Sequence, residues 1–77
     1  MKNKNEAQIF MKNVKSLRRY YGLSKKEMAE IMNVSVYTIN KIEKENLPPK
    51  LSVTAIFDLQ EYFGIKAEDL VSFLFSD

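Results

Sequence analysis

The stretch MAEIMNVSVYTINKIE, residues 28–43, decides the fold because its apolar residues follow two helical patterns separated by a short break. The break is NVS, residues 33–35. Asn33 is a residue that tolerates positive φ, and Ser35 can cap a following helix. The stretch therefore predicts helix, tight turn and helix, and the expected helices span about residues 25–32 and 36–44.

The two expected helices must cross steeply, because only three residues join them. A small residue, Ala29, stands where their backbones would meet. In the second helix Ile39 and Ile42 share the inner face. The residues left on the outer face are Val36, Tyr37, Asn40, Lys41 and Lys44.

A longer helix is predicted ahead of this stretch, from an N-cap at Asn5 to about Tyr21. Its apolar stripe is Phe10, Val14, Leu17 and Tyr21. Gly22 ends it, because glycine readily adopts the left-handed conformation at this position. Ser24 and Glu27 then form the pattern of a capping box, which starts the next helix.

Two further helices are predicted after the prolines of ENLPPKL, residues 45–51, which break the pattern. The first is capped by Ser52 and ends at Gly64; its apolar side comprises Val53, Ile56, Phe57, Leu59 and Phe63. The second lies within residues 65–77 and carries Glu68 and Asp69 in its first turn. We expect one all-α domain over residues 1–77, with the helix-turn-helix at 25–44.

Composition narrows the function classes. The chain has 77 residues, no Cys and no His, so the commonest metal ligands and general bases are missing. We expect no enzyme activity, no metal and no cofactor. No apolar run approaches the ~18 residues of a membrane span, so we expect a cytoplasmic protein without membrane contact.

Charge is divided unevenly along the chain. Residues 1–50 contain eleven Lys or Arg and five acidic residues, whereas residues 51–77 contain one Lys and five acidic residues. Such asymmetry is typical of a nucleic-acid surface at the basic end. An ordinary solvated surface with uneven charge is an equally good interpretation of charge alone.

The segment LRRYYGLSKKEMAEIMNVSVYTINKIEK (17–44) resembles the helix-turn-helix of the phage repressor and Cro-like family of transcription regulators, and SVTAIFDLQEYFGIKAEDL (52–70) is similar to that family's last two helices. The resemblance covers residues 14–71. It implies a compact five-helix bundle of the lambda repressor-like (XRE) type. The chain departs from the family at Lys25, usually Gln, at Asn33, usually Gly, and after the third helix, where a Gly is usual and this chain has Glu45 and Asn46.

The resemblance also implies roles for the exposed residues. The second helix of the motif would lie in the major groove of double-stranded DNA. The expected base contacts come from Val36, Tyr37, Asn40 and Lys41. The expected phosphate contacts come from Lys25, Lys26, Ser35, Thr38 and Lys44. Arg18 and Glu43 match a structural ion pair that ties the first helix to the recognition helix.

Two hypotheses about function follow. The first is a small sequence-specific regulator that binds a two-fold symmetric operator as a homodimer. Of the two kinds of regulator, we expect a repressor. The second is a protein-interaction module, such as an antitoxin-like partner or adaptor, that keeps the fold without operator recognition; Ile31, Val36 and the apolar C-terminus favour it. For the dimer, the segment LVSFLF (70–75) is apolar nearly all round, and its expected interface residues are Leu70, Phe73, Leu74 and Phe75.

Overall fold

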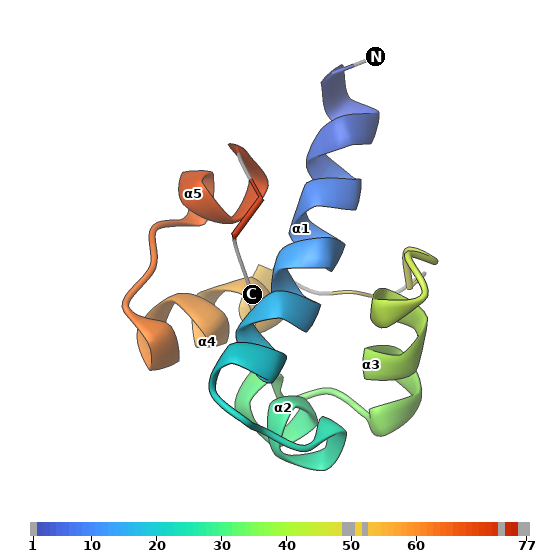
Figure 1. Ribbon diagram of the computed structural model, residues 1–77, viewed down its shortest axis with the longest axis vertical. Helices are drawn as coiled ribbons and strands as arrows, with labels where there is room; N and C mark the ends of the chain where they lie inside the picture. Colours follow the sequence, from blue (N-terminus) through green and yellow to red (C-terminus); the bar gives the residue numbers. More distant parts are fainter. Residues whose placement is uncertain (1, 49–50, 52, 73, 76–77) are drawn as a thin grey trace.

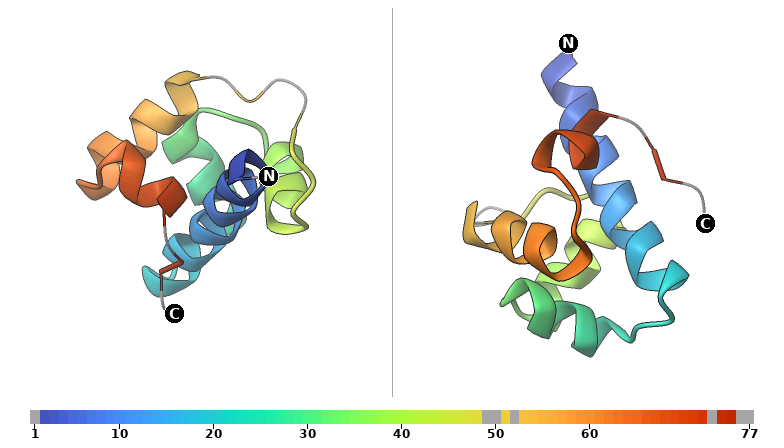
Figure 2. Two further views of the ribbon diagram at one scale, coloured as in Figure 1. Left: turned by 90° about the horizontal axis from the view of Figure 1, so that it is seen from above. Right: turned by 90° about the vertical axis from the view of Figure 1, so that its left-hand side faces the viewer.

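The computed structural model describes residues 2–48, 51, 53–72 and 74–75, and within them it contains helices and no strands (Figure 1). The helices are α1 (Lys2–Tyr20), α2 (Lys25–Met32), α3 (Val36–Glu43), α4 (Val53–Phe63) and α5 (Ala67–Ser72). The longest helix, α1, has α3 on one side and α4 with α5 on the other, while α2 crosses beneath its C-terminal end (Figures 1 and 2). The predicted all-α, five-helix architecture is confirmed.

The core lies where α1 meets α3 and α5, and where α2 meets α3 and α4. Burial of the apolar side chains in this core is the main favourable term in folding, at roughly 25 cal/mol per Å² of apolar surface removed from water. Tyr21, predicted in the α1 stripe, is instead 54% exposed, because α1 ends one residue before it. The buried apolar residues are Phe10, Met11, Val14, Leu17, Met28, Ala29, Met32, Ile39, Ile42, Ala55, Leu59 and Leu70.

The predicted helix boundaries are confirmed around α2 but not at the start of α1. Gly22 has φ 66°, and Ser24 forms the predicted capping box with Glu27. The prediction of Asn5 as an N-cap was wrong, since α1 already begins at Lys2. No Gly or Pro lies between these two positions to interrupt the helix. Ser52, the predicted cap of α4, lies outside the described residues.

The apolar side predicted for α4 is only partly buried. Successive residues of a helix are about 100° apart, so Ala55 and Leu59 share one face while Val53 and Phe57 lie on another. Ala55 and Leu59 are buried against the core, whereas Val53 is 64% and Phe57 59% exposed. The apolar residues of α4 therefore extend around more of the helix than the face that packs against the rest of the domain.

The C-terminus of α3 ends in a left-handed turn without glycine. Glu45 has φ 61°, and its N–H donates to the carbonyl of Ile42 at 2.9 Å. The N–H of Asn46 donates to the carbonyl of Lys41 at 2.9 Å, so the last carbonyls of α3 are satisfied as they are in helices that end on glycine. The family's usual Gly is therefore not needed for this turn to form.

Candidate nucleic-acid interface

The turn between α2 and α3 is fixed by local hydrogen bonds. Asn33 adopts the left-handed conformation, with φ 57°, as predicted. The next N–H, that of Val34, donates to the carbonyl of Ala29 at 2.9 Å, and Ala29 itself is buried where the two helices meet. Ser35 then caps α3, its Oγ accepting the N–H of Thr38 at 3.1 Å. These contacts set the direction of α3 as it leaves α2.

The outer face of α3 carries the residues predicted to read bases. Ile39 and Ile42 are fully buried, and this anchors the helix so that its opposite side meets solvent. Val36 is 40% and Tyr37 69% exposed. The remaining two, Asn40 and Lys41, are half-buried. The structure thus brings all the predicted base-contacting residues onto one short helix.

Within this face, Lys41 and Tyr37 interact with each other. The Lys41 Nζ lies 5.5 Å from the centroid of the Tyr37 ring, a cation–π distance. The amide of Asn40 has both donors and an acceptor. The other side chains of this face supply a phenol, an ammonium and an apolar group. These groups match the donor and acceptor patterns and the thymine methyl that are displayed in the major groove of DNA.

The predicted phosphate-contacting residues surround this face. Lys25 and Lys26 are exposed in the first turn of α2, and Lys44 is exposed at the C-cap of α3. The Oγ of Ser35 and the Oγ1 of Thr38 lie 3.1 Å apart, so these two hydroxyls take part in the cap of α3. The charged members of the set therefore lie at both ends of the motif, and the hydroxyl members lie at the start of α3.

A paired arginine and glutamate hold α3 in place. Arg18 Nε donates to Glu43 Oε2 at 2.5 Å, and Arg18 Nη2 donates to Glu43 Oε1 at 3.1 Å. A further donor, Nη1, reaches the carbonyl of Leu23 at 2.9 Å. The Glu43 side chain is 7% and that of Arg18 18% exposed. The predicted ion pair therefore exists, and it links α1, the loop after it and the end of α3.

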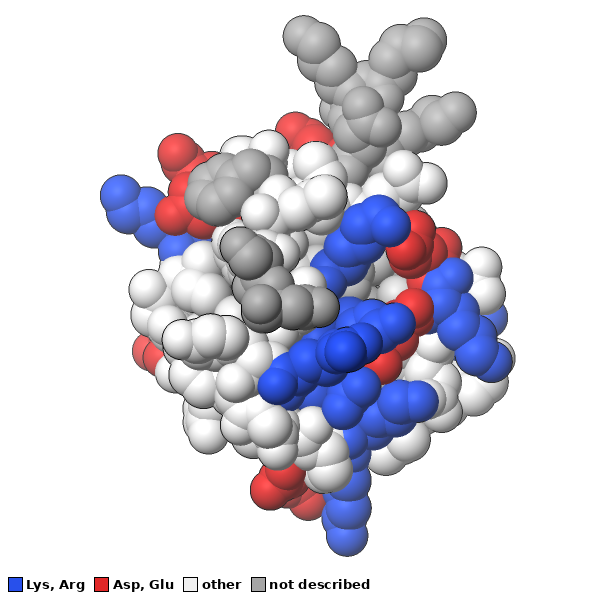
Figure 3. Space-filling view, in the orientation of Figure 1, with Lys and Arg blue, Asp and Glu red and all other residues white. Residues whose placement is uncertain are grey.

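Sequence reasoning missed a row of cations on α1. Lys12, Lys15 and Arg19 follow one another at spacings of three and four residues, which places them along one face of the helix. Figure 3 shows that Lys and Arg side chains gather over the face formed by α1 and α3. Lys12 is paired with Glu45, Nζ to Oε2, at 2.8 Å. The helical spacing was the signal in the sequence that could have revealed this row.

Three of the four tyrosines, Tyr20, Tyr21 and Tyr62, lie together at the rim of the domain. Tyr20 and Tyr62 are 69% and 61% exposed. The ring of Tyr21 packs against Phe63 with centroids 5.1 Å apart, and each of these two also meets its neighbour in sequence edge-on. The cluster joins the end of α1 to the end of α4 and does not line the outer face of α3.

Of the residues predicted at a dimer interface, the three that the structure describes differ in their burial. Leu70 is fully buried in the core of a single copy, so its assignment to the interface was wrong. Phe75 is half-buried and packs against the same core, because its N–H is held by Asn13 Oδ1 at 2.8 Å. Leu74 is 57% exposed, and Phe73 lies outside the described residues. Helix α5 ends at Ser72, so Leu74 and Phe75 lie after it and not on a helix that is apolar nearly all round.

The remaining features concern membranes, metals and Ile31. In the described part of the chain, no helix has both the length and the apolar character needed to cross a membrane. In the same part, no group of three or more His, Cys, Asp or Glu side chains could hold a metal ion.

Ile31 is half-buried and packs against the core, so it is not the exposed apolar residue that the interaction-module hypothesis requires.

Comparison with known proteins agrees with this geometry. A helix-turn-helix family model matches residues 14–70, which include the whole of α2, α3 and α4. The chain belongs to this helix-turn-helix family. A protein of Methanocaldococcus jannaschii, named as an uncharacterized HTH-type transcriptional regulator, is 35% identical to it over 68 residues, which are 87% of this chain and 97% of the relative. No solved structure matches the chain significantly.

Family membership fixes the coarse functional class. The lambda repressor-like helix-turn-helix is a DNA-binding fold of transcription regulators and not of enzymes. In such motifs the second helix is the one that enters the major groove, and here that helix is α3. The chain is therefore a DNA-binding regulator by family.

Proposed function

We propose that this protein is a transcriptional repressor that recognises an operator sequence with the outer face of α3. The observation that carries the proposal is the orientation of α3, with Ile39 and Ile42 fully buried and Tyr37 69% exposed on the other side. Such a repressor acts by occupying the operator, because duplex DNA bound by the domain is closed to other proteins.

In this proposal each residue on the outer face of α3 makes a different contact with the DNA. Asn40 pairs with an adenine through two hydrogen bonds, and Val36 meets a thymine methyl. Tyr37 offers its hydroxyl to a base edge or a phosphate. Lys41 leaves the Tyr37 ring to reach a guanine or a phosphate. Lys25, Lys26 and Lys44 position the duplex by contacting phosphates, which carry no sequence information.

Replacing Asn40 with alanine is expected to weaken binding to the preferred site by ~1–3 kcal/mol and to relax the preference at one or two base pairs. The physical reason is the loss of a two-bond contact to one base edge. The measurement has two parts: selection of bound sites from random duplex DNA, and titration of the selected site at fixed salt.

The matched control for this experiment is Lys25→Ala, which removes a phosphate contact. It should weaken all sequences alike and lower the slope of log affinity against log salt by about 0.9 per lost contact. An Asn40→Ala protein that selects the same sequence logo as the wild type would show that α3 does not read bases in this way.

We also propose that the operator is a two-fold repeat bound by two copies of the chain. Support comes from the small surface of a single motif and from Leu74, an apolar residue 57% exposed near the C-terminus. Joining two weak half-site contacts raises affinity through effective concentration. The two α3 helices would then lie about 34 Å apart, one turn of DNA.

Sedimentation velocity at tens of micromolar, with and without the selected DNA, tests this arrangement. The wild type is expected to bind the operator as two copies, and Leu74→Glu is expected to reduce that stoichiometry. The polar exposed substitution Ser72→Glu serves as the matched control. A wild type that stays monomeric both free and on DNA, with no symmetry in the selected sites, would remove the dimer from the proposal.

A further inference from the structure

A second concave site lies outside the face of α3. It is a hollow of about 260 Å³ between α1 and the residues that follow α5. One wall consists of Lys12, Lys15, Ser16 and Arg19 on α1. The opposite wall consists of Leu74 and Phe75. We call it the cationic hollow, and Figure 3 shows that Lys and Arg side chains gather over α1.

The charges in the cationic hollow do not cancel. Two carboxylates, those of Glu43 and Glu45, also border it, but Glu43 is paired with Arg18 and Glu45 with Lys12. Within the described residues, Lys15 and Arg19 have no carboxylate in salt-bridge contact. They stand four residues apart on one helix face, where two like charges repel each other. An anion bound between them would relieve this repulsion.

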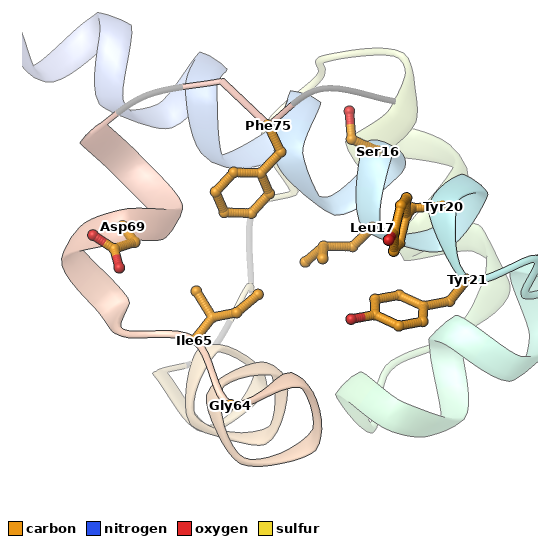
Figure 4. A pocket seen from close by; sticks show the side chains of 8 residues that line it. All are labelled: Ser16, Leu17, Tyr20, Tyr21, Gly64, Ile65, Asp69 and Phe75. Carbon is orange, nitrogen blue, oxygen red and sulfur yellow. The ribbon is translucent and has the colours of Figure 1, made fainter.

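The apolar wall of the hollow is fixed in place. The N–H of Phe75 donates to Oδ1 of Asn13 at 2.8 Å, and Asn13 is fully buried in the middle of α1. Behind Phe75 lies another hollow of about 360 Å³, which Figure 4 shows with the Tyr20 and Tyr21 rings on its far side. Phe75 and Ser16 border both spaces. Phe75 therefore separates the two spaces, and Lys15 and Arg19 line the cationic hollow together with it.

We infer that the cationic hollow is a binding site for a phosphate group, with Lys15 and Arg19 as its cations. A phosphate suits the site because Arg presents several donors to its oxygens and Lys supplies a second charge. Ser16, which lies between Lys15 and Arg19 in the sequence, also lines the hollow, and its hydroxyl can donate a further hydrogen bond. The phosphate can belong to a small phosphorylated molecule, whose organic part lies against Phe75, or to the DNA backbone beyond the contacts of α3.

The first experiment uses the free protein, so it does not depend on DNA recognition. Phenyl phosphate is titrated at constant ionic strength while the backbone amide signals are followed by NMR. Saturable shifts are expected in α1 near Lys15 and Arg19. Either Lys15→Gln or Arg19→Gln should weaken this binding about tenfold, as loss of one charge-assisted contact would. The matched control is Lys66→Gln, which removes an exposed lysine from the turn before α5.

The second experiment measures the salt dependence of DNA binding for the same variants. If phenyl phosphate saturates the site and the DNA slope is unchanged, the ligand is a small phosphorylated molecule. If phenyl phosphate does not bind but Lys15→Gln and Arg19→Gln each lower the slope by about 0.9, while Lys66→Gln does not, the phosphate belongs to DNA. The inference is overturned if shifts rise linearly with concentration in every variant and the slopes are equal. If α3 proved not to read bases, neither the phenyl phosphate titration nor the salt dependence of DNA binding would change. The proposal of operator recognition and the proposal of a phosphate site can therefore fail independently.

Discussion

Replacing Glu43 with alanine is expected to lower the free energy of unfolding by about 2–4 kcal/mol, several times the effect of breaking an exposed ion pair. The Glu43 side chain is only 7% exposed and accepts two hydrogen bonds from Arg18. Its removal leaves the guanidinium, 18% exposed, with the Leu23 carbonyl as its remaining described partner. Partial access to water keeps the cost below that of a fully buried charge. Urea denaturation with linear extrapolation measures the change.

Two further variants distinguish this cause from general damage. Lys12→Ala breaks the pair with Glu45, whose side chains are 46% and 38% exposed, and should cost about 0–1 kcal/mol. The double variant Arg18→Met with Glu43→Leu replaces both charges with apolar groups and should recover most of the loss, because no charge is then left buried. A double variant as unstable as Glu43→Ala would contradict the explanation.

The Arg18–Glu43 pair also connects stability to function, since it holds the end of α3 against α1. Without it, the outer face of α3 is expected to shift relative to Lys25 and Lys26 of α2, the lysines proposed to contact phosphates. A displacement of this kind should weaken binding to all DNA sequences, unlike the loss of Asn40, which is proposed to relax the preference at one or two base pairs. Measuring both site selectivity and stability therefore separates residues that position α3 from residues that read bases.

The helix-turn-helix could be predicted from the sequence because its determinants are local. The capping box of Ser24 and Glu27, the left-handed conformation of Asn33 and the cap formed by Ser35 each depend on neighbours within about one turn. Burial of Ile39 and Ile42 then follows from helical spacing alone. The exposure of Tyr37 is the complement of that burial, which is why the candidate face of α3 could be predicted as well.

Features that depend on distant partners could not be predicted in this way. Helical spacing in α4 allows Phe57 to be buried, but the other helices pack on the face of Ala55 and Leu59, and Phe57 is left 59% exposed. Leu70 belongs to a segment that is apolar nearly all round and was predicted to leave apolar surface exposed, yet Leu70 is fully buried within the domain, where α5 packs against α1. The cationic hollow needs the segment after α5 to return to α1, and no local pattern indicates that return.

Asn13 illustrates the same limit within α1. In the sequence it is one polar residue beside the stripe of Phe10, Val14 and Leu17, with no signal that separates it from a solvent-facing residue. In the structure it is fully buried, with Nδ2 donating to the carbonyl of Leu70 at 2.8 Å. It also accepts the N–H of Phe75. One amide side chain thus fastens both α5 and the segment after it to α1.

Replacing Asn13 with alanine is expected to lower the free energy of unfolding by about 2–4 kcal/mol. The substitution takes a hydrogen-bond partner from two backbone groups, the Leu70 carbonyl and the Phe75 N–H, and leaves a cavity beside them. The Phe75 side chain should then become more accessible. Urea denaturation measures the loss of stability, and hydrogen exchange at residue 75 measures the release of the segment. Asn46→Ala, at an exposed position, is the matched control.

The variant Asn13→Asp tests the burial of this site by making stability depend on pH. The introduced carboxyl would face the Leu70 carbonyl away from water, so its pKa in the folded state should rise above the ordinary value of about 3.9. The protonated carboxyl can donate to Leu70 and accept from Phe75, as the amide does. The stability that it supplies is therefore fully present below pH ~3.9 and is lost as pH rises through the higher pKa of the folded state. Relative to wild type at each pH, the deficit in unfolding free energy should grow by up to about 1.4 kcal/mol per pH unit in this window. A deficit that is constant from pH 3 to pH 7 would mean that residue 13 is in contact with water.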